Sequence, residues 1–256
     1  MKIVQNILTK NDCYKAGRKI TVKGLMIHSV GCSQPKASVF LNTWNKSGVQ
    51  MCVHAFIDGN DGTVYQTLPW NHRGWHGGGS SNNTHIGVEM CEPSTIKYTS
   101  GANFTDQNPT KTKEVVMRTY NAAVELFAFL CKEYKLNPLT DIVSHKEGHK
   151  KGIASNHGDP EHLWSKFGLS MDGFRKDVQT QMGKGAATTP VKEEKPVQAN
   201  SVPYMVNVPA NTDVYSAPAI MQIEKKGAYT IVEEKNGYGK LKSGAGWIKL
   251  SEVKKL

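Results

Sequence analysis

Short apolar runs alternate with longer helical patterns in the first 182 residues of the chain. The runs are bounded by Gly, Asp or Pro, which is typical of buried strands. The segment DGNDG, from Asp58 to Gly62, separates two of them and predicts a hairpin turn. The predicted strands are GLMIHSVG (24–31), CVHAFID (52–58), TVYQTLP (63–69) and HIGVEMCE (85–92).

Helical periodicity is clearest between Pro109 and Leu136, where apolar residues recur every three or four positions. Asn137-Pro138 then predicts the end of this helix. Two shorter helices are predicted at 35–44 and 170–182. Because strands and helices interleave, the sequence predicts an α/β domain with one central sheet.

The pattern changes after residue 182. Residues 183–203 are mostly small, charged or proline, with little to bury, and predict a linker. Residues 204–256 hold short strand-like runs broken by Gly and Asn-Gly, which predict a small all-β barrel of five or six strands. The expected organisation is therefore a domain at 1–182, a linker at 183–203 and a second domain at 204–256.

Composition excludes several classes of protein. With 256 residues and 38% hydrophobic content, the chain is an ordinary globular protein. It has no apolar run of the roughly 18–20 residues that span a bilayer, so membrane insertion is not expected. No signal peptide is recognisable at the start, so we expect the protein to begin in the cytoplasm. Its five cysteines are scattered without a CxxC motif, which favours buried free thiols over disulfides or a cysteine-rich zinc site.

The formal net charge of +10 is compatible with an anionic polymer as partner. The charge is spread over both parts of the chain, and no basic-aromatic motif for reading nucleic acid is present. Nucleic acid is therefore not an expected partner, whereas an anionic cell wall is compatible with this charge.

All nine histidines precede the linker, so any metal chemistry belongs to the first domain. His28 and His145 each follow a short apolar run, so both could point into one cleft at the rim of the sheet. Asp159, from a loop, would complete a His/His/Asp set. Catalytic zinc takes three protein ligands and keeps one position open, polarises carbonyls and lowers the pKa of bound water to about 7. The spacing matches no short metal motif, and each histidine could equally be structural.

Several motifs carry a resemblance to a known family. They are MIHSVG, CVHAFIDGNDGTVYQTLPW, RGWHGG, HIGVEMCEP and SHKEGHKKGIASNHGDPEHLW. In this order they resemble the zinc-dependent N-acetylmuramoyl-L-alanine amidases related to peptidoglycan recognition proteins, and most closely the endolysins of phages that infect Gram-positive bacteria. The resemblance covers most of residues 1–182. It implies a central mixed β-sheet flanked by helices, one zinc ion, and peptidoglycan of the Gram-positive cell wall as substrate.

The resemblance also assigns roles to residues. It implies His28, His145 and Asp159 as metal ligands, although some members carry Cys where Asp159 stands. It implies Glu89 as the proton acceptor, with Glu147 as the rival, and His157 as a helper of the transition state. His54 is expected to line the cleft, and Trp75 and His76 to contact substrate. Trp70 and Trp164 are either core residues or cleft walls, and His149 and His162 are expected behind the ligands or on the surface.

The last part of the chain, GAYTIVEEKNGYGKLKSGAGWIKL, resembles bacterial SH3-type wall-binding domains. The resemblance as a whole implies a lytic enzyme that stays in the host cytoplasm until a holin-type release to the wall. Three alternatives remain open: an autolysin of the same chemistry, a non-catalytic peptidoglycan-binding protein, and a cysteine peptidase that uses Cys32 or Cys52. The candidate aromatic residues of a binding groove, which could equally be barrel core, are Tyr215, Tyr229, Tyr238 and Trp247.

Overall fold

A six-stranded sheet organises the first of two units in the computed structural model, and that unit spans residues 1–188. The second unit spans residues 189–256. The structure describes residues 1–184, 204–208, 212–216, 219–223, 227–235, 238–243, 247–250 and 253–255. Most of the expected linker, residues 185–203, therefore lies outside the described residues. In the described part of the chain, no helix has the length and apolar character needed to cross a bilayer.

The sheet of the first unit is mixed, which confirms the expected fold class. Every neighbouring pair of strands is parallel except β3 and β4, which form the hairpin predicted from DGNDG. Gly62 in that turn has a φ of 72°, a left-handed conformation that favours glycine. The strands lie in the order β1 (Ile3–Gln5), β4 (Val64–Gln66), β3 (Ala55–Ile57), β5 (His85–Met90), β2 (Gly24–Ser29) and β8 (Ile142–Ser144).

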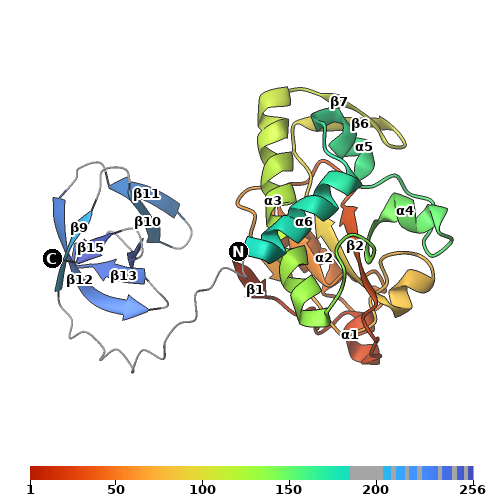
Figure 1. Cartoon of the computed structure of the whole chain (residues 1–256), viewed down its shortest axis with the longest axis horizontal. Helices are drawn as coiled ribbons and strands as arrows, with labels where there is room; N and C mark the ends of the chain where they lie inside the picture. The colour runs from red at the N-terminus through yellow and green to blue at the C-terminus, as the bar shows by residue number, and fades with distance from the viewer. Residues whose placement is uncertain are drawn as a thin grey trace. The chain divides into compact units, whose positions relative to one another are not determined.

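Alternation along the central strands separates a structural face of the sheet from a functional face. Leu25 and Ile27 of β2, like Ile86 and Val88 of β5, belong to the main apolar core. Helices α3 (Pro109–Tyr134) and α6 (Met171–Lys184) supply the other half of this core and lie side by side (Figure 1). The intervening residues of the same strands, which include His28, therefore face the opposite side.

Helix α3 forms where the apolar period predicts it, and its ends have clear local causes. The side chain of Asn108 accepts a hydrogen bond from the backbone N–H of Lys111, and Pro109 occupies the first turn, where its missing N–H costs nothing. At the other end, Lys135 takes a left-handed φ of 54°. The helix thus stops at Tyr134, before Asn137-Pro138.

Shorter elements cover the functional face and the rim of the sheet. Helix α2 packs on Phe56 of β3 through Ala37 and Leu41. A hairpin of β6 and β7, with its turn at Gly101, was not predicted from the sequence. The remaining elements and their bounds are α1 (Asp12–Ala16), α2 (Ala37–Trp44), η1 (Ser80–Asn83), β6 (Ile96–Ser100), β7 (Asn103–Asp106), α4 (His145–Lys150), α5 (Glu161–Trp164) and η2 (Ser165–Phe167).

The described residues of the second unit form seven strands where five or six were expected, and the strand pairs among these residues are antiparallel. Ile231, Leu241 and Ile248 form its buried core, with half-buried Tyr229 packed against them. The side chains of Tyr215, Tyr238 and Trp247 lie outside the described residues. In sheet order the strands are β11 (Ala219–Ile223), β10 (Thr212–Ser216), β14 (Trp247–Lys249), β13 (Tyr238–Leu241), β12 (Gly227–Lys235), β9 (Tyr204–Val208) and β15 (Lys254–Lys255).

Candidate active site

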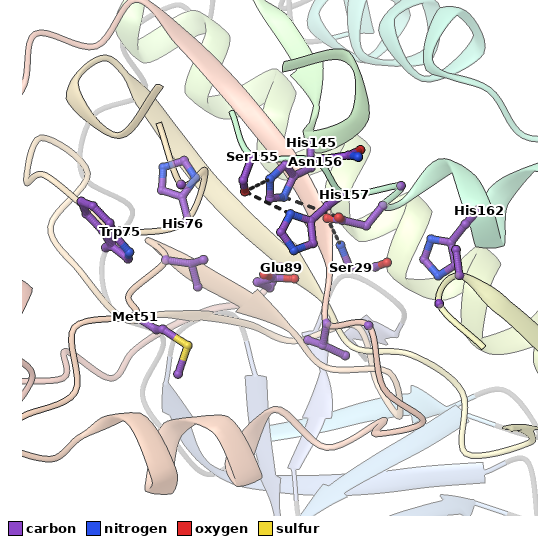
Figure 2. Close-up of a pocket in the computed structure, with 18 of the residues that line it drawn as sticks. Ser29, Met51, Trp75, His76, Glu89, His145, Ser155, Asn156, His157 and His162 are labelled. Carbon is purple, nitrogen blue, oxygen red and sulfur yellow. Dashed lines mark hydrogen bonds and ion pairs between the residues drawn. The ribbon is translucent and has the colours of Figure 1, made fainter. Parts of the chain in front are cut away.

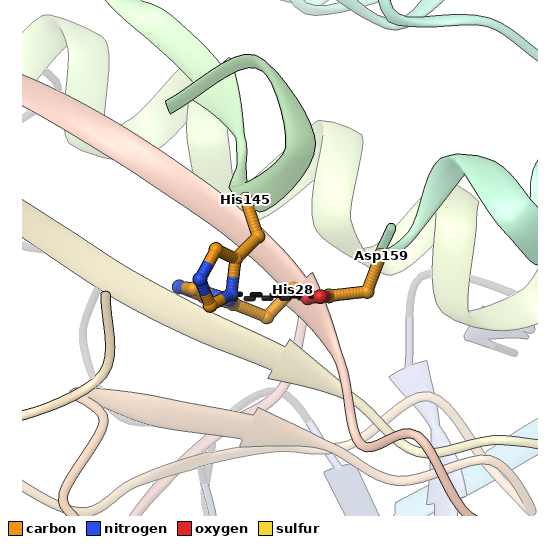
Figure 3. A group of neighbouring side chains, drawn as sticks. All are labelled: His28, His145 and Asp159. Atoms are coloured by element: carbon orange, nitrogen blue, oxygen red, sulfur yellow. Dashed lines mark hydrogen bonds and ion pairs between the residues drawn. The ribbon is translucent and has the colours of Figure 1, made fainter. Parts of the chain in front are cut away.

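Three residues far apart in the sequence converge at the carboxyl ends of β2 and β8. His28 lies near the end of β2, His145 is the first residue of α4 directly after β8, and Asp159 lies in the loop before α5. Because β2 and β8 are parallel neighbours, the histidines that follow their paired residues meet at one edge of the sheet. One ligand atom from each residue lies within 4.8 Å of the others (Figure 3).

The local structure around His145 explains its position and settles the place of Glu147. Ser144 caps α4: its hydroxyl accepts from the backbone N–H of Glu147, and the Glu147 carboxylate accepts from the backbone N–H of Ser144. The same carboxylate forms an ion pair with Arg175 of α6. The Glu147 carboxylate is therefore occupied by contacts that stabilise the start of α4, the helix that carries His145.

The donor atoms in this cluster suit a divalent cation of the zinc type. Nδ1 of His28 lies 3.0 Å from Nδ1 of His145 and 3.3 Å from Oδ2 of Asp159. Burial acts to raise the pKa of Asp159, but the close approach of His145 and His28 to its carboxylate outweighs burial and holds this pKa well below its usual range. Two imidazole nitrogens and an ionised carboxylate are ligands that zinc takes in proteins, so these residues fit the ion.

The stretch from Ser155 to Asp159 wraps around His145. The hydroxyl of Ser155 lies 3.1 Å from Nε2 of His145, 3.0 Å from Nδ1 of His157 and 3.3 Å from the carbonyl oxygen of Gly77. A hydroxyl has one proton to donate and two lone pairs that accept, so the tautomers of the two imidazoles decide which of these groups receives its proton. This serine contacts both the candidate ligand His145 and the exposed His157 (Figure 2).

Glu89 lies on the functional face beside the candidate metal ligands His28, His145 and Asp159, which are called the ligand cluster below. It stands opposite His28 in the pairing of β5 with β2 and lines the same pocket. Its Oε2 is buried without a hydrogen-bond partner among the described residues. Burial, together with the negative charges of Asp159 and Glu92, raises the pKa of Glu89 well above its ordinary value. A carboxylate in this setting is a stronger base than a solvated one.

The pocket that contains these groups has a volume of about 680 Å³ and extends to both sides of the ligand cluster. Met51 and Trp75 lie at one end and His162 at the other, with Glu89 and His157 between them (Figure 2). Trp75 is 43% exposed, which is unusual for so large an apolar side chain. The guanidinium of Arg73 stacks over its ring at 5.2 Å from the centroid. The pocket is thus an open groove with an aromatic wall.

A second group of titratable residues flanks this pocket and was not anticipated as a unit. The hydroxyl of Tyr98 lies 2.7 Å from Oε2 of Glu92, to which it donates, and 2.6 Å from Nε2 of His162. The other carboxylate oxygen of Glu92 accepts from the backbone N–H of Gly31 at 3.2 Å. This cluster of Glu92, Tyr98 and His162 ties hairpin β6–β7 and helix α5 to the segment after His28. His162 was expected only behind the ligands or on the surface, and no sequence signal joined it to Glu92.

Comparison with known proteins agrees with this arrangement. The sequence profile described as N-acetylmuramoyl-L-alanine amidase matches residues 17–162, a range that contains the ligand cluster and Glu89. The chain belongs to this amidase family. A search of curated proteins finds no match.

Solved structures share the fold of this amidase. The Staphylococcus aureus hydrolase AmiA, determined with its ligand, is 18% identical with a TM-score of 0.53, over 74% of this chain and 87% of that one. The PlyG catalytic domain is 17% identical with a TM-score of 0.51, over 77% of this chain and 100% of that one. A mutant of PlyL is 18% identical with a TM-score of 0.50, over 70% of this chain and 99% of that one. Together with the family match, these folds identify the chain as a peptidoglycan hydrolase of the amidase class.

Some residues expected in the cleft of the amidase lie elsewhere. His54 is fully buried and is not among the residues that line the pocket: its Nδ1 accepts from the N–H of Gly87 and its Nε2 donates to the carbonyl of His72. Burial lowers its pKa to about 4, so the ring is neutral. The expectation that His54 lines the cleft is therefore wrong, because this residue is buried behind the residues that line the pocket. Trp164 is core, Trp70 packs against the same core, and His149 is exposed on α4.

Neither Cys32 nor Cys52, the two candidate nucleophiles, has the setting of a reactive thiol. All five cysteines are free thiols, and four are buried, whereas Cys32 is exposed, contrary to the expectation of buried thiols throughout. The pKa of Cys32 is raised by partial burial and by Glu92 and Glu89. That of Cys52 is raised by a hydrogen bond with Cys13 and by burial. Because the thiolate is the nucleophile, this speaks against a cysteine peptidase.

Glu92 should make the stability of the amidase depend on pH. Burial raises its pKa to about 7 from an ordinary value of 4.5, although hydrogen bonds from Tyr98 and Gly31 act in the other direction. The folded state therefore keeps a proton that the unfolded state loses, and the free energy of unfolding falls as pH rises through this window. The contribution of Glu92 is about 3 kcal/mol.

We therefore expect Glu92→Gln to flatten the dependence of Tm on pH between about pH 4.5 and 7, by about 5–10 °C for a unit of this size. Thermal melts of the full chain across this range, monitored by far-ultraviolet circular dichroism, measure it. Glu114→Gln, on the exposed side of α3, is the matched control and should leave the wild-type slope in place. An unchanged slope in Glu92→Gln would mean that another group governs the pH dependence.

Proposed function

We propose that this chain is a zinc-dependent amidase that hydrolyses the bond between N-acetylmuramic acid and L-alanine in peptidoglycan. The observation that carries the proposal is the convergence of His28, His145 and Asp159 in an open pocket beside Glu89, whose Oε2 has no hydrogen-bond partner among the described residues. When bound by these three residues, zinc would supply a Lewis acid that polarises the scissile carbonyl and makes water more acidic.

Glu89 is the proposed proton carrier of the reaction. As water adds to the carbonyl carbon, Glu89 accepts its proton, and its raised pKa favours this step. The carbon–nitrogen bond then breaks, and Glu89 returns the proton to the nitrogen of L-alanine. The lactyl group of the sugar leaves as a carboxylate. Glu147 is not proposed for this role because the start of α4 and Arg175 occupy its carboxylate.

His157 is the proposed stabiliser of the oxyanion that develops on the carbonyl oxygen. Its Nδ1 lies 3.0 Å from the hydroxyl of Ser155, and the residue lines the pocket. Either a protonated imidazole or a neutral one with its proton on Nε2 would donate to this oxygen. Ser155 fixes the direction in which Nε2 points.

Substrate binding is assigned to the groove on both sides of these groups. Trp75 offers an exposed aromatic face that suits a sugar ring or a peptide stem. The second unit is proposed as an SH3-type wall-binding module. Its tether would raise the concentration of wall polymer near the pocket without new contacts in the pocket itself. With this module, the chain would act as a lytic enzyme on Gram-positive walls, and an autolysin of the same chemistry is the second candidate.

The experiment that tests the function is mass spectrometry of purified Gram-positive walls digested with the full chain. We expect new free amino termini on L-alanine and no new reducing sugar ends, and we expect a metal chelator to stop their release. New reducing ends would instead identify a glycosidase. A digest with neither product would favour a non-catalytic binding protein.

A further inference from the structure

His76, expected to touch the peptide stem, does line the pocket, but both of its ring nitrogens contact other groups of the protein. Nε2 of His76 lies 3.1 Å from the backbone carbonyl of His85, and because a carbonyl oxygen only accepts, this nitrogen carries a proton. In the neutral ring Nδ1 is then an acceptor, and it lies 3.0 Å from Nε2 of His28. His28 therefore donates from Nε2. Its Nδ1 points toward His145 and Asp159.

The ring of His76 is seated on a glycine. A Cβ atom on Gly87 of β5 would come within 2.4 Å of Cγ of His76, a distance that real Cβ contacts essentially never show. Gly87 pairs with Met26 of β2, so this seat lies two residues from His28 along the neighbouring strand. Any side chain at position 87 would push the imidazole out of its place beside His28.

The seat is itself held by a second histidine. The backbone N–H of Gly87 donates to Nδ1 of His54 at 3.0 Å, and its carbonyl accepts from the backbone N–H of His54 at 2.9 Å. Nε2 of His54 donates to the carbonyl of His72 at 2.8 Å, which fixes the tautomer of that ring as well. His54 thus stabilises the backbone on which His76 rests.

We infer that His76 is a positioning residue for the metal ligand His28, seated on Gly87 and oriented by the carbonyl of His85. It accepts the Nε2 proton of His28 and so selects the tautomer whose Nδ1 lone pair is available to a metal. The inference rests on the proposed function, because it takes His28 as a ligand. Partners that orient metal-ligating histidines in this way typically contribute about 10–100-fold to metal affinity.

The tautomer can be measured without metal. In the full chain stripped of zinc and labelled with ¹⁵N, two-bond proton–nitrogen NMR spectra should show Nε2 of His28 protonated. In His76→Leu this preference should be lost, with both tautomers of His28 populated. His149→Leu, at an exposed position of α4, is the matched control and should preserve the wild-type spectrum of His28. An unprotonated Nε2 in the wild type would overturn the inference, whatever the variants do.

Metal affinity supplies the second readout. Competition with a chromophoric chelator should show zinc bound about 10–100-fold more weakly by His76→Leu than by the wild type. His76→Asn should recover most of this loss, since its Oδ1 stands where Nδ1 stood and can accept from His28. Gly87→Ala should lower zinc affinity, as His76→Leu does. Gly183→Ala, at a position where a Cβ has no atom within 4 Å, should leave zinc affinity unchanged.

The outcomes separate this inference from the proposed function. If His76→Leu keeps wild-type zinc affinity while KM for wall fragments rises, His76 contacts substrate and the inference is wrong. If the wild type itself binds no zinc, the proposed function fails, and the tautomer of His28 still decides whether His76 positions it. If His76→Leu does not fold, the wild-type spectrum and Gly87→Ala give the answer.

Discussion

Replacing Asp159 with alanine should release the metal and lower the rate of amide hydrolysis by about 10³-fold or more. A bound metal contributes several kcal/mol to stabilising the transition state of such a reaction, and each 1.4 kcal/mol is worth about tenfold in rate. The close approach of His145 and His28 holds the pKa of Asp159 below its usual range, so the pocket favours the ionised carboxylate. Without this carboxylate two imidazoles remain, 3.0 Å apart at their Nδ1 atoms. Metal content by atomic absorption and release of L-alanine amino termini measure the two effects.

A substitution by cysteine separates loss of a ligand from loss of a side chain. Asp159→Cys should keep measurable zinc and part of the activity, because a thiolate is a zinc ligand and carries the same charge. Asp172→Ala is the control for removal of an acid, since its side chain is 87% exposed at the start of α6. It should match the wild type in both assays. Full activity in a folded Asp159→Ala variant would exclude this carboxylate from the mechanism.

Most of the central sheet was predictable because its strands have a short-range signature, whereas the edge strand β1 was not predicted. Apolar runs that end in Gly, Asp or Pro appear at β2, β3, β4 and β5, and the turn at DGNDG fixes the one antiparallel pair of this sheet. The helix at α3 was predicted from its apolar stripe and from the stop signal at Asn137-Pro138. The β6–β7 hairpin was missed because its strands are largely polar and exposed, and only Ile96 is deeply buried.

The neighbours of the predicted ligands could not be read from the sequence. Family motifs named His28, His145 and Asp159, but nothing local to His76, which lines the pocket, shows that its Nδ1 also contacts Nε2 of His28. That contact depends on the parallel register of β2 and β5 and on the missing side chain at Gly87. The cluster of Glu92, Tyr98 and His162 likewise joins three separate segments through hydrogen bonds that no periodicity encodes.

Glu89→Gln should lower kcat for amide hydrolysis by about 10²–10⁴-fold, the range of a lost general acid–base group. Glutamine keeps the size of the side chain and its place opposite His28 in the strand pairing, but it no longer accepts a proton. Zinc content should therefore stay at the wild-type level, which distinguishes this variant from Asp159→Ala. In the wild type, protonation of Glu89 should make the rate fall toward acid pH. The residual rate of Glu89→Gln should lack this fall.

Glu147→Gln is the matched control, because it removes the same charge from the other candidate base. In the wild type, the Glu147 carboxylate caps α4 and pairs with Arg175. The substitution should therefore affect the fold, with a loss of about 1 kcal/mol in the free energy of unfolding. Under conditions where both variants are folded, Glu147→Gln should keep kcat within a few-fold of the wild type. If Glu89→Gln were active while a folded Glu147→Gln was inactive, the proton acceptor would be Glu147 of α4 and not Glu89. The unpartnered oxygen of Glu89 in the pocket would then need another explanation.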